Sequence, residues 1–269
     1  MSNKFNPNEL LLERIRTVEE YDPATGELLG RYTQIENPSL QTTANATEVV
    51  DAMGVPIATF YNAQQGTFTF TNSLFSMDLA ASQFGDTKEI ADDENKITVP
   101  VTEILTIGND GKVVLKYTPV GVAGAEIKYV KVINENNTFG ATYEISPTLG
   151  NGKFTLDVEN KTITLPEGTT GNVFVKYERE STRAARVSKY ADSLPDVRSL
   201  LVHAIFHDPC NKNIVYAGVI YIPRAEIDIA NVDINLTSDG KHGATYKLVP
   251  PYCTGNQRPK LFDIIVTED

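Results

Sequence analysis

The sequence predicts a mainly β protein: a β-sandwich or barrel flanked by one α-helix, with a β-rich insertion in its centre. Short runs of alternating apolar and polar residues recur along most of the 269 residues, a period typical of half-buried strands. Turn signals such as Asn109-Asp-Gly111 separate these runs. Because no helical pattern separates the strands predicted between residues 97 and 178, βαβ folds are excluded.

The first predicted element is a β-hairpin over residues 13–36. Its turn is residues 22–26, Asp-Pro-Ala-Thr-Gly, in which the proline presets its own φ and the glycine permits a positive φ. Leu11, Ile15 and Val18 also fit helical spacing, so a short helix is the alternative for this segment.

A polar segment and a short strand follow the hairpin. Residues 37–48 are rich in Thr, Asn and Ala and predict an extended loop or arm. Strict alternation over residues 67–71 predicts a strand, and it places Phe68 and Phe70 on one face, which we expect to be the core face.

The predicted helix covers residues 74–84. Apolar residues recur there at helical spacing, Asn72 or Ser73 can cap the N-terminus, and Gly85 can end the helix. The charged residues 86–96 then predict a surface loop.

The rest of the chain reads as strands. Candidates in the central region are residues 97–107, 112–117, 126–133, 141–145, 153–158, 161–165 and 172–177. Candidates in the last third are residues 200–206, 213–222, 225–236, 241–249 and 261–266. The apolar phase of residues 225–236 slips by one at Ala230-Asn231, which predicts a β-bulge there. The opposite face of this strand carries Glu226, Asp228 and Asp233.

The net charge of −11 argues against a nucleic-acid-binding protein, because such binding depends on Lys and Arg neutralising phosphates. Two cysteines, Cys210 and Cys253, are too few for a disulfide scaffold. The sequence after Met1 has no apolar signal-peptide region, and no run approaches the roughly 20 apolar residues of a membrane span. We therefore expect a protein made in a reducing cytoplasm.

We expect no catalytic, cofactor or metal site. His203, His207 and Cys210, with Cys253 or His242, are the only tempting zinc ligands, but their spacing fits no zinc signature and favours packing or surface roles. The chain has no G-x-S-x-G elbow, no phosphate-binding loop and no G-x-G-x-x-G motif. The sequence thus predicts a protein that is not an enzyme.

Arg179, Arg183 and Arg186 form a local basic stretch in this acidic chain. A contact with an acidic neighbouring subunit fits the overall charge better than a nucleic-acid patch does. A solvated face is an equal alternative, and residues 183–186 are compatible with a helix.

The order of these elements resembles the tail tube (major tail) proteins of tailed bacteriophages. The family's passage from a strand into a helix is similar to residues 54–61 followed by 66–75. The extra β region of long members is similar to residues 119–177, and the closing hairpin is similar to residues 221–249. The resemblance implies a tube core over residues 1–96 and 179–269, with an insertion over residues 97–178.

The resemblance also implies a function. Members of the family assemble into rings, usually hexameric, and the rings stack into a tube that joins other tail proteins in the virion. The resemblance therefore implies synthesis and assembly in the host cytoplasm and no membrane partner. The resemblance also implies that DNA passes through an acidic lumen without tight binding, and Glu226, Asp228 and Asp233 are the candidates for lining it. An equal alternative is that these three carboxylates face the outer solvent. The rival functions are a distal tail protein, a capsid decoration protein, an Ig-like binding module or a β-sandwich hydrolase.

Overall fold

A computed structural model describes residues 5–232, 234, 237, 240–250 and 258–268. The chain forms two compact units, one made of residues 1–88 and 187–269 and the other of residues 89–186. Each unit has its own cluster of buried apolar residues, so each contains the apolar core that a domain needs. We call them the sheet unit and the barrel unit.

The sheet unit is built on an eight-stranded sheet. Its strands follow the order β2 (Leu28–Tyr32), β1 (Leu11–Tyr21), β14 (Arg198–His207), β15 (Val215–Ile227), β16 (His242–Leu248), β4 (Pro56–Asn72) and β3 (Ile35–Val50), with β17 (Asp263–Thr267) also paired to β15. All of these pairs are antiparallel. The hairpin predicted over residues 13–36 is confirmed as β1 and β2, and the helical alternative is wrong.

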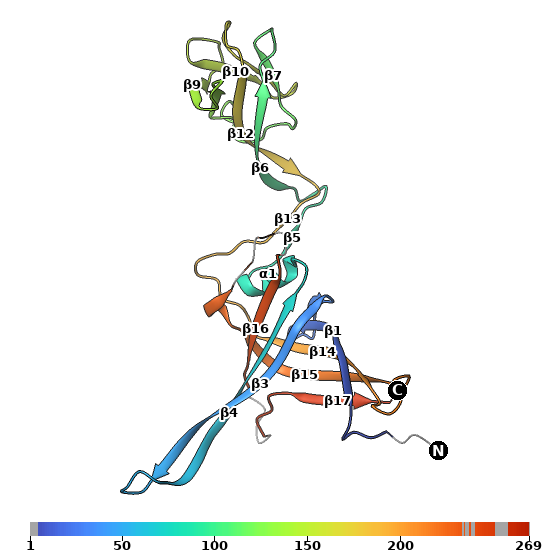
Figure 1. Ribbon diagram of the computed structural model, residues 1–269. Coiled ribbons are helices and arrows are strands. Elements are labelled where there is room, and N and C mark those ends of the chain that lie inside the picture. Colours follow the sequence, from blue (N-terminus) through green and yellow to red (C-terminus); the bar gives the residue numbers. More distant parts are fainter. Residues whose placement is uncertain (1–4, 233, 235–236, 238–239, 251–257, 269) are drawn as a thin grey trace. The chain divides into compact units, whose positions relative to one another are not determined.

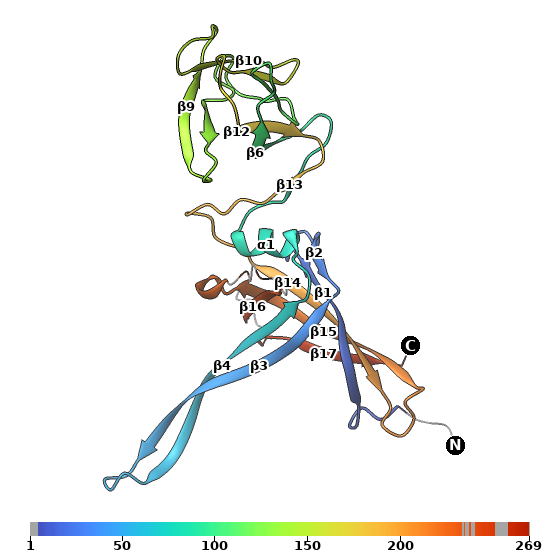
Figure 2. The ribbon, with the colours of Figure 1, turned by 45° about the horizontal axis from the view of Figure 1, so that its top comes forward.

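The prediction of a loop over residues 37–48 is wrong, because this segment lies inside the 16-residue strand β3. Its ladder with β4 runs from the Ile35–Asn72 pair to the Val50–Pro56 pair. The polar composition suggested a loop because both faces of much of this hairpin are exposed. The strand therefore shows no alternation of apolar and polar residues. Figures 1 and 2 show the hairpin running well beyond the neighbouring strands.

The helix α1 (Met77–Phe84) is the predicted one, shortened at its start. Its N-cap is Ser76 and not Asn72 or Ser73, since the Ser76 hydroxyl accepts a hydrogen bond from the Leu79 amide at 3.3 Å. Gly85 ends the helix as predicted, with a φ of 67°. Among the residues described, no helix is long and apolar enough to cross a membrane.

The core of the sheet unit lies between α1 and one face of the sheet. Phe68, Phe70 and Tyr246 are fully or almost fully buried there beside Leu79 of the helix, as predicted for the two phenylalanines. Glu20 is a carboxyl group in this apolar core with no exposed surface. Its side chain accepts hydrogen bonds from the hydroxyls of Ser82 (2.8 Å) and Tyr246.

The barrel unit is a nearly closed seven-stranded sheet. Its order is β6 (Ile97–Thr106), β12 (Asn172–Ser181), β8 (Tyr129–Ile133), β9 (Phe139–Ile145), β10 (Lys153–Asp157), β11 (Thr162–Thr164) and β7 (Lys112–Val114). The seven strands predicted for this region are confirmed. Two short strands, β5 (Glu89–Ile90) and β13 (Ala185–Arg186), pair with each other. The fold is therefore mainly β with one helix, as predicted.

Two local predictions are wrong. The strand expected over residues 225–236 is interrupted, because β15 stops at Ile227 and a 3-10 turn (Ile229–Asn231) stands where the bulge was expected. Residues 233, 235 and 236 of this predicted strand lie outside the described residues. The Asp228 carboxylate caps that turn by accepting a hydrogen bond from the Ala230 amide at 3.1 Å. Residues 183–186, compatible with a helix in sequence, contain β13 and no helix.

Candidate assembly surfaces

Among the residues that the structure describes, no helix covers one of the two faces of the sheet in the sheet unit. Thr67, Thr69 and Thr71 of β4 alternate with the buried phenylalanines and are half-buried on this face. Glu226 pairs across the strands with Lys247, and Lys247 pairs with Thr67, so polar side chains form a row across three strands. We call this surface the open sheet face.

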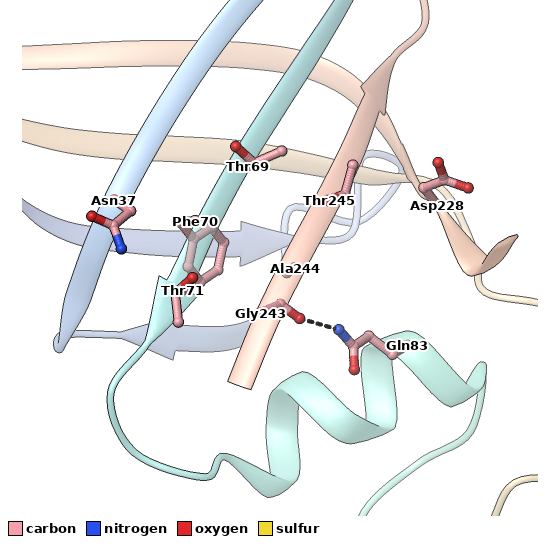
Figure 3. Close-up of a pocket in the computed structure, with 9 residues that line it drawn as sticks. All are labelled: Asn37, Thr69, Phe70, Thr71, Gln83, Asp228, Gly243, Ala244 and Thr245. Carbon is pink, nitrogen blue, oxygen red and sulfur yellow. Dashed lines mark hydrogen bonds between the residues drawn. The ribbon is translucent and has the colours of Figure 1, made fainter. Parts of the chain in front are cut away.

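Figure 3 shows a pocket in this region, where β4 ends and β16 begins. Thr69 and Thr245 are register partners there, and Asn37 lies on the neighbouring strand β3. The pocket holds about 190 Å³. The Gln83 amide of α1 donates a hydrogen bond to the Gly243 carbonyl at 2.7 Å and ties the helix to this end of the sheet.

The two described lumen candidates differ in their partners. Glu226 lies on the open sheet face with half of its side chain exposed, 3.9 Å from Arg224. Asp228 lies just beyond β15, and its carboxylate is 3.1 Å from the Lys247 ammonium. The hydrogen bonds from Lys247 and the Ala230 amide lower the pKa of Asp228. Asp233 lies outside the described residues.

The negative charge of the chain is concentrated in the sheet unit. That unit holds 21 acidic and 13 basic residues, a formal charge of −8. The barrel unit holds 14 acidic and 11 basic residues, a charge of −3. The unit with the open sheet face is thus the one that repels polyanions more strongly.

Among the described residues of the sheet unit, the far part of the β3–β4 hairpin holds the largest group of exposed apolar side chains. We call residues 43–65 the arm. Its strongly exposed side chains include Met53 (89% exposed), Tyr61 (73%) and Phe60 (62%), and also Val49, Val50, Val55 and Ile57. Neighbouring residues of a strand point to opposite faces, so Phe60 and Tyr61 expose apolar surface on both faces of the arm.

A hairpin of this kind is unsuited to stand alone in water. Beyond Gly66, β4 has no partner on its β16 side, and β3 has none on its outer side among the described strands. Two-stranded hairpins are marginal by themselves, and a large exposed apolar patch marks an interaction surface. The arm therefore has the composition and the open edges of a segment that packs against another protein.

Residues 11–249 match the YomU/Tube protein family, a family of phage tail tube proteins. The chain belongs to this family. A comparison with curated proteins finds no match. Family membership confirms the resemblance inferred from the sequence, and it gives the chain a structural, non-enzymatic role in the tail tube of a virion, in assembly with copies of itself and other tail proteins.

The basic stretch of this tail tube protein is divided by its contacts. The Arg179 guanidinium lies 4.1 Å from the centre of the Tyr117 ring, a cation–π contact. Arg186 donates two hydrogen bonds to Glu89, at 2.6 and 3.1 Å. Arg183 is exposed, and no ion pair is recorded for it within the described residues.

The three histidines considered as zinc ligands have separate partners. His207 contacts Glu13 at 2.5 Å, His203 contacts Glu19 at 3.3 Å, and His242 is buried against Gln83 at 2.8 Å. Cys253 lies outside the described residues; within the described part no three His, Cys, Asp or Glu side chains are grouped to hold a metal.

The apolar end of the arm was not predicted from the sequence as a functional surface. The signal was present as Val49 to Tyr61, an apolar run around Gly54 and Pro56, but no interaction surface was predicted from it.

Proposed function

We propose that this chain forms rings, hexameric as is usual in the family, which stack into a tube that conducts DNA. The observation that carries the proposal is the arm, because exposed apolar side chains on both faces of a projecting hairpin need a protein surface on each side. In a stack of rings, a neighbouring copy supplies such surfaces.

The open sheet face is our candidate for the wall of the bore. Its row of hydroxyl and charged side chains is suited to water, and the −8 charge of the sheet unit disfavours lasting contact with phosphates. Glu226, Asp228 and Asp233 remain the proposed lumen residues. Arg224 and Lys247 lie beside the first two, so the repulsion comes from the unit as a whole more than from these carboxylates.

We further propose that residues 1–96 and 179–269 form the tube wall, with residues 97–178 as an insertion. The barrel unit supports this division because Phe154, Val173 and Val175 are fully buried in a core of its own. Arg183 is the best of the three arginines for a subunit contact, since the other two already have partners within the chain.

The arm variant Phe60→Ser/Tyr61→Ser tests the proposal. The purified wild-type chain, concentrated at neutral pH, is expected to form hollow tubes in negative-stain electron microscopy. The variant is expected to stay unassembled, with a free energy of unfolding within about 0.5 kcal/mol of wild type because both side chains are exposed. Val122→Ser, an equally exposed position of the barrel unit, is the matched control and should assemble. Tube formation by the arm variant would contradict the role of the arm.

The lumen residues are tested by removing their charge. Phage carrying Glu226→Gln, Asp228→Asn and Asp233→Asn should assemble normal tails, because Asn can still cap the turn at Ala230. DNA delivery should slow, since the wall loses repulsion. Tails that deliver DNA at the wild-type rate would remove these residues from the lumen hypothesis.

A further inference from the structure

Strand β1 has an open edge. On one side it pairs with β14 along its whole length, whereas on the other side β2 pairs only with Val18–Tyr21. The backbone of residues 11–17 therefore has no partner strand on that side among the described strands. An open edge of this kind can accept a strand from another chain.

A basic groove lies beside this edge. It has a volume of about 490 Å³ and is lined by Arg14, Arg16 and Arg31, and Glu36 is the only acidic residue among its described lining residues. Glu36 is already held by Lys241 and by the Ser73 hydroxyl. The groove is thus a positive surface on the more acidic of the two units.

The positive charges of the three groove arginines are only partly neutralised by contacts within the chain. Arg16 is exposed, and no ion pair is recorded for it within the described residues. Arg14 has only a 3.7 Å contact with Glu13 between two exposed side chains, a kind of pair that contributes little. Arg31 contacts Glu19 at 3.1 Å and still has half of its side chain exposed.

The arm has the complementary chemistry. Between residues 41 and 66 the only charged residues are Glu48 and Asp51, and there is no Lys or Arg. The arm also has open strand edges and exposed apolar side chains, and β1 exposes Leu11 and Leu12 at its start. Charge, hydrogen bonding and apolar surface therefore match between these two segments.

We propose that the arm of one copy docks along the open edge of β1 in a second copy, with Glu48 facing Arg14 and Arg16. The inference rests on the proposed tube function and names the partner surface of the arm. Each copy then offers one arm and accepts another, a head-to-tail contact that propagates along a stack.

Reversing the charges tests this pairing. The groove variant is Arg14→Glu/Arg16→Glu, and the arm variant is Glu48→Arg/Asp51→Asn. Asn is chosen because the Asp51 side chain accepts hydrogen bonds from the Met53 and Val55 amides, both at 2.8 Å, and must keep an acceptor. Lys128→Glu/Lys176→Glu, two exposed lysines of the barrel unit, changes the net charge as much as the groove variant and is its control.

Assembly is measured by sedimentation and electron microscopy near 0.15 M salt. Each single-surface variant should need a concentration about tenfold higher or more to assemble, because like charges or lost pairs meet at the contact. The chain carrying both sets of changes should assemble again, and so should the lysine control. The pairing would be overturned if the groove variant formed tubes at the wild-type concentration, or if the combined changes did not restore assembly. In either case, tubes formed by the wild-type chain would still support the proposed function.

Discussion

At the scale of single residues, the most unusual group is Glu20. It is a carboxyl with no exposed surface, placed among Tyr32, Tyr246 and Ser82 beneath α1. Burial raises its pKa above the ordinary 4.5, more than the hydrogen bonds from Tyr246 and Ser82 lower it. The pKa of Tyr246 is also raised, chiefly by burial. The core therefore favours a protonated, neutral Glu20.

Glu20 should make stability depend on pH. Between pH 4.5 and its raised pKa, the folded chain holds a proton that the unfolded chain has released. The contribution of Glu20 to the free energy of unfolding must then fall as pH rises through this window, by up to about 1.4 kcal/mol per pH unit. The Glu20→Gln variant lacks this titration.

The measurement is chemical denaturation of both proteins from pH 4.5 to 8. The difference in unfolding free energy, wild type minus Glu20→Gln, should decrease with rising pH. Exposed carboxylates with lowered pKa values, such as Glu13 and Glu36, titrate in both proteins and cancel from the difference. A difference that stays constant across the range would show that Glu20 does not titrate as inferred.

At the scale of elements, the end of α1 depends on one glycine. Gly85 has a φ of 67°, and a Cβ added there would lie 2.4 Å from the backbone carbonyl of Leu194. Gly26, in the β1–β2 turn, has a φ of 74° but open space around it. The two positions share the left-handed conformation and differ in packing.

Substitution by alanine separates these two effects. Gly26→Ala should cost about 1–2 kcal/mol from the left-handed conformation alone. Gly85→Ala should cost about 2–5 kcal/mol, because the overpacking against Leu194 is added. Thermal or urea unfolding measures both, and equal losses would show that the contact at Leu194 relaxes without cost.

The elements also show what sequence could predict. Strands with one buried face, such as residues 67–71 and those of the barrel unit, were found because burial imposes alternation. Gly85 marked the end of α1 because its conformation requires glycine. The strand β3 was missed because much of it is exposed on both faces. Its sequence therefore lacks the alternation of apolar and polar residues that would indicate a strand. The Asp228 cap was missed because local side-chain hydrogen bonding outweighed the apolar pattern of residues 229–232.

At the scale of the molecule, the functional surfaces were only partly predictable. The acidic charge and the family resemblance pointed to a tube protein, and the family match confirms that role. The arm and the basic groove depend on register: which strands stop short, and which edges they leave open. Sequence lists Arg14, Arg16 and Arg31, but only the β1–β2 register brings the third arginine beside the first two.

Cryo-electron microscopy of assembled tubes would show which surface lines the bore and where the arms lie. We expect stacked rings in which the open sheet face, with Glu226, lines the channel, and in which Phe60 and Tyr61 of each arm are buried against a neighbouring copy. A map with the open sheet face on the outside of the tube would contradict its role as the wall of the bore, and a map with the arms in solvent would contradict their role in assembly.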